Sequence, residues 1–261
     1  MSLSRLALRL ATLEALRPTS SLASDGPWPT LAGKHVYDSR LAPLEDLSED
    51  EARPIIVVYT DDDDGMSGQK RGGPPFLMTV DLCFEISVIA KVKGEADPAV
   101  YELAYPFTDP ELETSLDLLG AQIFFALLYA PGGKIWRNVS ASRVQGPKSV
   151  AYRSSEEAAR IARRHMTWKV EVNGEHYDAA PASTPSGLQI LPEPLRSVAC
   201  ALPANSYGAA IIAGLIEEPT FPGMPVPQPL QTVGLNVKAH LPGAPIPAEP
   251  NITGEVDNLQ G

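Results

Sequence analysis

The clearest pattern in the chain is an alternation of apolar and polar residues from position 79 to position 88. Side chains on a β-strand point alternately to its two faces, so the apolar set faces a core and the polar set faces away. The apolar set consists of Val80, Leu82, Phe84, Ile86 and Val88, and the polar set of Thr79, Asp81, Cys83, Glu85 and Ser87. The pattern predicts a strand that ends near Val92, with one buried face and one polar face.

An earlier apolar run, residues 54–60, is rich in β-branched side chains and predicts a buried strand. We expect this strand to end at Asp61, where four consecutive aspartates begin. The segment 65–75 that follows contains four glycines and no core residue. A connection this long and this charged is not a simple hairpin, and it predicts a loop that the sheet presents to a partner.

Two segments show the helical spacing of apolar residues. A leading helix is predicted by a stripe of leucines: Leu3, Leu6, Leu10 and Leu13. The longest helix is expected to begin at Asp109, an N-cap residue followed by proline, and to end at the Pro-Gly-Gly of residues 131–133. Apolar residues occupy nearly all of its surface. We therefore expect the sheet to cover one side, and another subunit or the leading helix to cover the rest.

The remaining elements complete a sheet of four strands. Residues 143–152 predict a third strand, which the Gly-Pro pair at 146–147 confines to an edge or interrupts with a bulge. Residues 167–172 alternate again and predict the fourth strand. Between these two strands, residues 154–164 open with capping-box spacing and predict a short helix.

Proline divides the chain into regions. Residues 18–34, rich in proline, serine and glycine, predict a connector. Fourteen of the 26 prolines lie in the last 81 residues. We therefore predict an α/β domain of the α+β kind over residues 1–180, with a small mixed or antiparallel four-stranded sheet flanked by helices. A proline-rich, extended C-terminal arm is predicted over residues 181–261, in which two short apolar pieces, 195–202 and 207–216, could dock on another surface.

Charge and cysteine content exclude several classes of protein. The formal net charge of −11 argues against binding of DNA or RNA through clustered Lys and Arg residues. Cys83 and Cys200 are interpreted as free thiols of a reducing compartment, with a single bridge as the alternative. The most apolar windows, 116–130 and 207–216, are shorter than the roughly 20 residues that a bilayer requires, so no membrane span is predicted.

Candidate chemistry is sparse. The run Asp61 to Asp64 offers carboxylates to a hard cation, but an EF-hand alignment would place Arg71 where the bidentate glutamate belongs, so a solvated acidic loop is predicted instead. Cys83 shares its strand face with two acids, which would raise its pKa. The sequence contains no nucleophile elbow, phosphate-binding loop, dinucleotide fingerprint or zinc-binding helix motif. We therefore predict no enzyme, no metal and no cofactor.

The order of these segments resembles the tail terminator, or tail completion, proteins of long-tailed bacteriophages over residues 3–178. The likeness is carried by the leading helix, Val36-Tyr37-Asp38-Ser39, an acidic stretch, Pro54-Ile55-Ile56-Val57-Val58-Tyr59-Thr60, the alternating strand, the apolar helix, Trp136 and a closing helix with a strand. It implies a structural virion protein without catalytic residues, located in the tail or neck and assembled in the host cytoplasm.

The resemblance also implies a homo-hexameric ring on the last ring of the tail tube. Such a ring ends tube polymerisation and provides the attachment surface for the head connector. The implied partners are therefore sister copies, the tail tube protein and the head-tail connector protein. DNA would pass through an acidic lumen without specific binding, because like charge prevents trapping.

Two groups of residues are candidates for contacts in this ring, by their position. The candidates for contact with the tube or connector are Asp61, Asp62, Asp63, Asp64, Met66, Gln69, Lys70 and Arg71. The candidates for the subunit interface are Asp81, Glu85, Arg160, Arg163 and Arg164. The three arginines form a basic patch on the predicted short helix, which would meet an acidic segment of a neighbouring copy. An ordinary charged helix face is the alternative.

Three alternative functions stay open at this point. One is another phage neck, connector or adaptor protein. The second is a divalent-metal-dependent hydrolase that uses Asp61 to Asp64. The third is a mitochondrial or bacterial adaptor with a processed N-terminus, because the first residues carry arginines and few acids.

Overall fold

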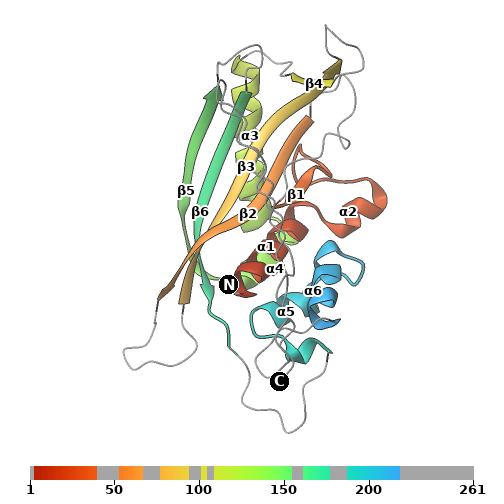
Figure 1. Cartoon of the computed structure of the whole chain (residues 1–261), viewed down its shortest axis with the longest axis vertical. Coiled ribbons are helices and arrows are strands. Elements are labelled where there is room, and N and C mark those ends of the chain that lie inside the picture. The colour runs from red at the N-terminus through yellow and green to blue at the C-terminus, as the bar shows by residue number, and fades with distance from the viewer. Residues whose placement is uncertain are drawn as a thin grey trace, which may run out of the picture. The chain divides into compact units, whose positions relative to one another are not determined.

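The computed structural model describes residues 3–39, 53–66, 77–93, 101–104, 109–154, 161–176 and 187–217. Within them the chain forms a twisted β-sheet with helices packed on one face (Figure 1). The strands are β1 (Val36–Asp38), β2 (Arg53–Met66), β3 (Leu77–Lys93), β4 (Tyr101–Ala104), β5 (Ser140–Ser154) and β6 (Ile161–Asn173). The helices are α1 (Leu3–Leu16), α2 (Thr19–Ser24), α3 (Asp109–Leu128), α4 (Lys134–Val139), α5 (Leu195–Ala201) and α6 (Tyr207–Glu217).

The sheet has six strands in the order β1-β2-β3-β6-β5, with β4 paired to β3 outside this path. β1 pairs with β2 in parallel, and the other pairs are antiparallel. The mixed sheet is confirmed, but the predicted number of four strands is wrong. Neither β1 nor β4 was among the four predicted strands. Both additions are very short strands, in which alternation is too brief to be recognised.

The alternating pattern of residues 79–88 is confirmed in β3. All five residues of its apolar set are at most 1% exposed. The predicted end of β2 at Asp61 is wrong, because the strand continues through the aspartates to Met66, with a β-bulge between Thr60 and Asp63. Met66 pairs with Leu77, so β2 and β3 form a hairpin whose connection, residues 67–76, lies outside the described residues. The part of β2 beyond β1 has no further strand beside it among the described residues, and an edge of this kind tolerates charge because it can stay in water.

The predicted short helix over residues 154–164 is also wrong where the structure describes it. Residues 161–164 belong to β6, and Arg163 and Arg164 pair with Ser87 and Ile86 of β3. These partners are more than seventy residues away, so local capping spacing does not reveal them. β5 is confirmed as an edge strand, and one of its two register shifts lies between Gln145 and Lys148, at the predicted Gly-Pro pair.

The helices α1 and α3 are confirmed. α1 packs against β2, α3, α4, α5 and α6, and nine of its fourteen residues are buried. The predicted connector at 18–34 contains the short helix α2, and α4 was not predicted. Among the described residues no single helix is both long and apolar enough to span a bilayer; α3 together with the segment Pro131–Val139 passes that test only as a pair bent by 62°.

The core is centred on Trp168 of β6. Its ring lies 5.5 Å from the ring of Phe84 on β3, 5.7 Å from Phe124 on α3 and 6.2 Å from Trp136 on α4, measured between centroids. Trp136 and Trp168 are at most 1% exposed. The aromatic cluster therefore joins the sheet to α3 and α4, and aromatic pairs at such distances add to the free energy of burial.

The predicted extended form of the C-terminal arm is wrong for residues 187–217. They form a 3-10 turn, α5 and α6, and the two helices pack against α1 (Figure 1). Leu195, Val198 and Ile212 are buried, and the Tyr207 hydroxyl donates a hydrogen bond to Asp38 of β1 over 3.0 Å. The two apolar pieces thus dock on the N-terminal helix. The predicted division at residue 180 falls outside the described residues and stays a prediction, as does the form of residues 218–261.

Candidate functional site

The face of the sheet opposite α3 carries a network of polar side chains from β2, β3 and β6. The Tyr59 hydroxyl lies 2.7 Å from Nε2 of His165, and the two rings are stacked with centroids 5.9 Å apart. Ile55 and Val57 form a small apolar cluster on this face with the partly buried Tyr37 and Tyr59. The face is therefore only partly polar, because β2 contributes apolar residues next to the polar set of β3.

Cys83 is the buried centre of this network. Its Sγ lies 3.6 Å from an Asp61 carboxylate oxygen and 3.7 Å from the Thr167 hydroxyl. Burial, opposed by the Thr167 hydrogen bond and reinforced by the charge of Asp61, raises the pKa of the thiol to about 11. Burial and the neighbouring Cys83 and Asp61 raise the pKa of Tyr59 to about 12. The predicted direction for Cys83 is confirmed, and both groups stay protonated at neutral pH, so neither is an activated nucleophile.

The buried thiol makes stability depend on alkaline pH. In the unfolded chain Cys83 ionises near pH 9, whereas in the folded chain its pKa is about 11. Above pH 9 the unfolded state therefore binds fewer protons, and stability is lost as the pH rises toward 11. We expect this group to cost about 2 kcal/mol of unfolding free energy between pH 8 and pH 10.5. Urea unfolding of Cys83→Ser, which replaces the thiol with a hydroxyl that does not ionise in this pH range, should show a smaller alkaline loss by that amount.

The control for this comparison is Cys200→Ser, because Cys200 is an exposed free thiol. Its loss between the two pH values should match that of the unaltered protein. Equal losses in Cys83→Ser and Cys200→Ser, or rapid alkylation of Cys83 in the folded protein, would contradict the burial of this thiol.

The predicted interface acids on β3 are paired within the chain. Asp81 accepts a hydrogen bond from Lys169 over 3.1 Å, and Glu85 pairs with Arg163 over 3.0 Å. Arg164 lies on the opposite face of β6 and pairs with Glu113 and Asp117 of α3. Arg163 and Arg164 therefore do not form one basic patch on a helix, because neighbouring residues of a strand point to opposite faces.

The other predicted contact residues lie at the bulged end of β2 or outside the described residues. Asp61 is exposed, Asp62 to Asp64 and Met66 occupy strand positions in β2, and Gln69, Lys70, Arg71 and Arg160 are not described. Among the described residues no group of three or more His, Cys, Asp or Glu side chains is arranged to hold a metal ion. The contact roles of these residues stay a prediction.

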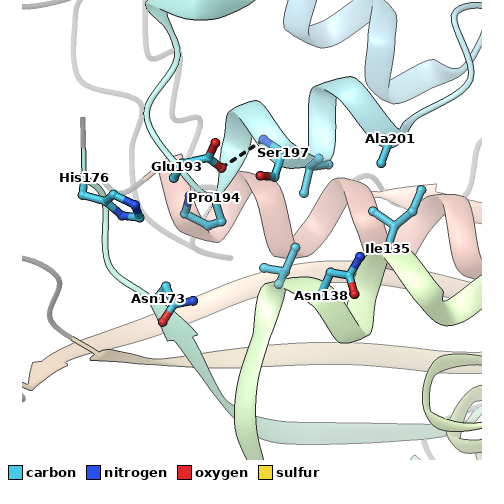
Figure 2. Close-up of a pocket in the computed structure, with 10 residues that line it drawn as sticks. Ile135, Asn138, Asn173, His176, Glu193, Pro194, Ser197 and Ala201 are labelled. Atoms are coloured by element: carbon cyan, nitrogen blue, oxygen red, sulfur yellow. Dashed lines mark hydrogen bonds between the residues drawn. The ribbon is translucent and has the colours of Figure 1, made fainter. Parts of the chain in front are cut away.

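A half-open cavity of about 280 Å³ lies between α4, the end of β6 and α5 (Figure 2). Its polar lining consists of Asn138, Asn173, His176, Glu193 and Ser197, and its apolar lining of Ile135, Val139, Pro194, Val198 and Ala201. Sequence reasoning missed this cavity. Its walls come from three segments that tertiary packing brings together, and no local pattern marks them.

The Glu193 carboxylate in this cavity is already engaged. It accepts hydrogen bonds from Arg196 Nε over 2.9 Å and from the backbone N–H of Ser197 over 3.1 Å, as Figure 2 shows for Ser197. Burial alone would raise the pKa of Glu193, but these hydrogen bonds outweigh it and the pKa lies below its usual value. The carboxylate thus stabilises the start of α5 as a charged acceptor, and it is poorly suited to act as a general base.

An apolar patch covers the outer side of α3. Leu118, Phe125 and Tyr129 lie on one helical stripe and are 45%, 61% and 66% exposed, with Phe124 beside them. The rings of Phe125 and Tyr129 are stacked with centroids 6.1 Å apart. The prediction that the sheet covers only one side of α3 is consistent with this exposure. A contiguous aromatic patch of this kind is typical of a surface that binds another protein.

Comparison with known proteins leaves the family open. No family model matches the chain, and no curated protein matches it. Among solved structures, a chain from a structure described as the virion of a native gene transfer agent particle is 21% identical, with a TM-score of 0.29. The likeness covers 64% of this chain and 95% of that chain. A TM-score this low carries no argument about function, so the proposal below rests on the residues and geometry of this chain.

Proposed function

We propose that this protein is a tail terminator. It is a structural subunit of a virion that forms a ring at the head-proximal end of a phage tail tube, stops tube polymerisation and provides the attachment surface for the head connector. The proposal draws on the sequence resemblance over residues 3–178, and the observation that carries it is the shape of the sheet.

The strands β2, β3, β5 and β6 are 14, 17, 15 and 13 residues long. Strands of globular domains usually have about 3–10 residues. At the Met66–Leu77 end of the hairpin, Leu77 is 36% exposed, whereas Met78 and Val80 beside it are buried. Long strands with outer edges that no described strand pairs support a role in which the sheet reaches neighbouring subunits.

Two further observations support an assembly role. The aromatic patch on α3 is an apolar surface that the described residues of the chain leave exposed. The net charge of −11 suits a ring around DNA, because like charge keeps the duplex from binding to the lumen. In this role the partners are five sister copies, the tail tube protein and the head-tail connector protein, and the protein acts without turnover of a substrate.

Disrupting the gene in its phage tests this proposal directly. Without the protein, tail tubes should grow beyond their normal length and fail to join heads. A gold-labelled tag on the protein should mark the junction of tail and head in electron micrographs. Tubes of normal length, or a label at the distal end of the tail, would contradict the tail terminator role. A label at the junction with normal tube length would instead support another neck or connector protein.

A further inference from the structure

We propose that neighbouring copies join head to tail through their sheet edges: β5 of one copy pairs with the aspartate-bearing end of β2 of the next, so that the sheet continues around the ring. This inference deepens the proposed function, since it names the interface of the ring and rests on that ring for its context.

Both edges are open among the described strands. Within the described part of the chain, β5 pairs only with β6, and β1 pairs with β2 only opposite Ile56–Val58. The Arg5 guanidinium donates a hydrogen bond to the Thr60 carbonyl over 2.6 Å and so covers the next position of β2. From Asp61 to Met66 the outer edge of β2 has no strand partner in the described part of the chain. Unpaired backbone N–H and C=O groups on a long edge are a template for another strand.

The direction of the strands favours this pairing. Each neighbouring pair in the series β2, β3, β6 and β5 is antiparallel, so β5 runs opposite to β2. When a second copy is placed beside the first in the same orientation, its β2 therefore lies antiparallel to β5, which is the more common and slightly more stable ladder. Such a contact uses two different surfaces, and contacts of this type form a ring when the rotation from one copy to the next closes on itself.

The charges of the two edges are complementary. The open end of β2 contains Asp61 to Asp64, whereas β5 contains Arg143, Lys148 and Arg153 and no acidic residue. Opposite charges on facing strands stabilise the pair, and like charges destabilise it. Two β2 edges or two β5 edges would repel each other, so the charges select the head-to-tail contact over a two-fold dimer.

The register places these charges at the same level of the sheet. One row of paired residues runs across the sheet from Tyr59 on β2, through Cys83 on β3 and Thr167 on β6, to Lys148 on β5. A second row runs from Asp63 on β2, through Val80 and Val170, to Val144 on β5, which is next to Arg143. When neighbouring copies stand at the same height, the aspartate positions on β2 of one copy therefore lie opposite the basic positions on β5 of the next.

Engineered disulfides test the geometry of this contact. In a Cys200→Ser background, Asp63→Cys and Val144→Cys are introduced into one chain and the protein is oxidised. The expected result on a non-reducing denaturing gel is a ladder of covalent multimers that ends at the ring size. Each single variant should give no product larger than a dimer. A product of the double variant that stops at the dimer would show a two-fold contact and would overturn the head-to-tail pairing.

Charge-reversal variants test how much the opposite charges on β2 and β5 stabilise the contact between copies. Asp63→Lys with Asp64→Lys, or Arg143→Glu with Lys148→Glu, should raise the concentration needed for half-assembly roughly tenfold. All four changes in one chain should restore it, because each interface again pairs opposite charges. The matched control for the β5 change is Lys34→Glu with Lys134→Glu, two exposed residues outside β2 and β5, which should leave assembly unchanged. Assembly is followed by light scattering, with tail tubes present if the free protein stays monomeric.

The outcomes separate this inference from the proposed function. Rings or tail caps that form without a disulfide ladder and ignore the charge reversals would overturn the β5–β2 interface and leave the tail terminator role intact. Absence of assembly both alone and on tail tubes would overturn both.

Discussion

Replacing Trp168 with alanine is expected to lower the free energy of unfolding by about 4 kcal/mol, because large-to-small changes of buried aromatic residues cost about 3–5 kcal/mol. The side chain is 1% exposed and contacts Phe84, Phe124 and Trp136 from one strand and two helices. Its removal would leave a cavity that these elements cannot close together. Urea unfolding followed by far-UV circular dichroism measures the change.

Two further variants test whether the loss in Trp168→Ala comes from packing in the core, rather than from the indole N–H group or from any change of an aromatic residue. The Nε1–H groups of Trp168 and Trp136 are buried without a hydrogen-bond partner among the described residues. Trp168→Phe removes one of these groups and keeps an aromatic ring, so it should cost less than half as much as the alanine variant. Phe125→Ala removes a side chain that is 61% exposed and should change monomer stability by less than about 0.5 kcal/mol. A loss below about 1 kcal/mol in Trp168→Ala would contradict the central position of this residue.

Gly133→Ala is expected to destabilise the protein by about 3 kcal/mol, at the upper end of the cost of overpacking. A Cβ at Gly133 would overlap the carbonyl oxygens of Ala126 and Leu127 and lie 2.7 Å from an Arg137 guanidinium nitrogen. Arg137 donates hydrogen bonds to the carbonyls of Leu127 and Ala130, each over 2.9 Å. The methyl group would thus displace the side chain that satisfies the carbonyls of Leu127, in the last turn of α3, and of Ala130 just after the helix.

The neighbouring glycine supplies the matched control. A Cβ at Gly132 would lie 3.9 Å from the Ala15 carbonyl oxygen, which is an ordinary contact. Gly132→Ala should therefore be close to neutral, and the difference between the two variants isolates the overlap at Gly133. Thermal and urea unfolding measure both. Equal stabilities of the two variants would show that the junction between α3 and α4 adjusts easily.

Several elements could be predicted because their patterns report burial directly. The alternation from Val80 to Val88 reflects one buried face of β3, and the apolar stripe with its N-terminal Asp-Pro marks α3. The raised pKa of Cys83 followed from the acids on its strand, although burial and Asp61 are the main causes in the structure. For β3 and α3 the pattern that marks the element lies within the element itself, whereas the main causes of the Cys83 pKa lie elsewhere in the fold.

Other elements depended on partners far away in the sequence. The aspartates of β2 lie in a strand because β3 supplies backbone partners up to the Met66–Leu77 pair, and residues 161–164 are strand rather than helix for the same reason. The cavity near His176 and Glu193 exists only because α4, α5 and β6 meet there. Charge and capping patterns describe local preference, which tertiary hydrogen bonding overrides.

The pattern along the chain was enough to predict the two-faced strand, the apolar helices, the acidic balance and the lack of a recognisable catalytic motif. The three-dimensional fold was needed to show which strands are edges, which charges share a level across the sheet, and that residues 187–217 of the proline-rich part include helices docked on α1. The difference arises because periodicity along the chain records which side of an element is buried. The register between strands records which residues meet, and that depends on the fold as a whole.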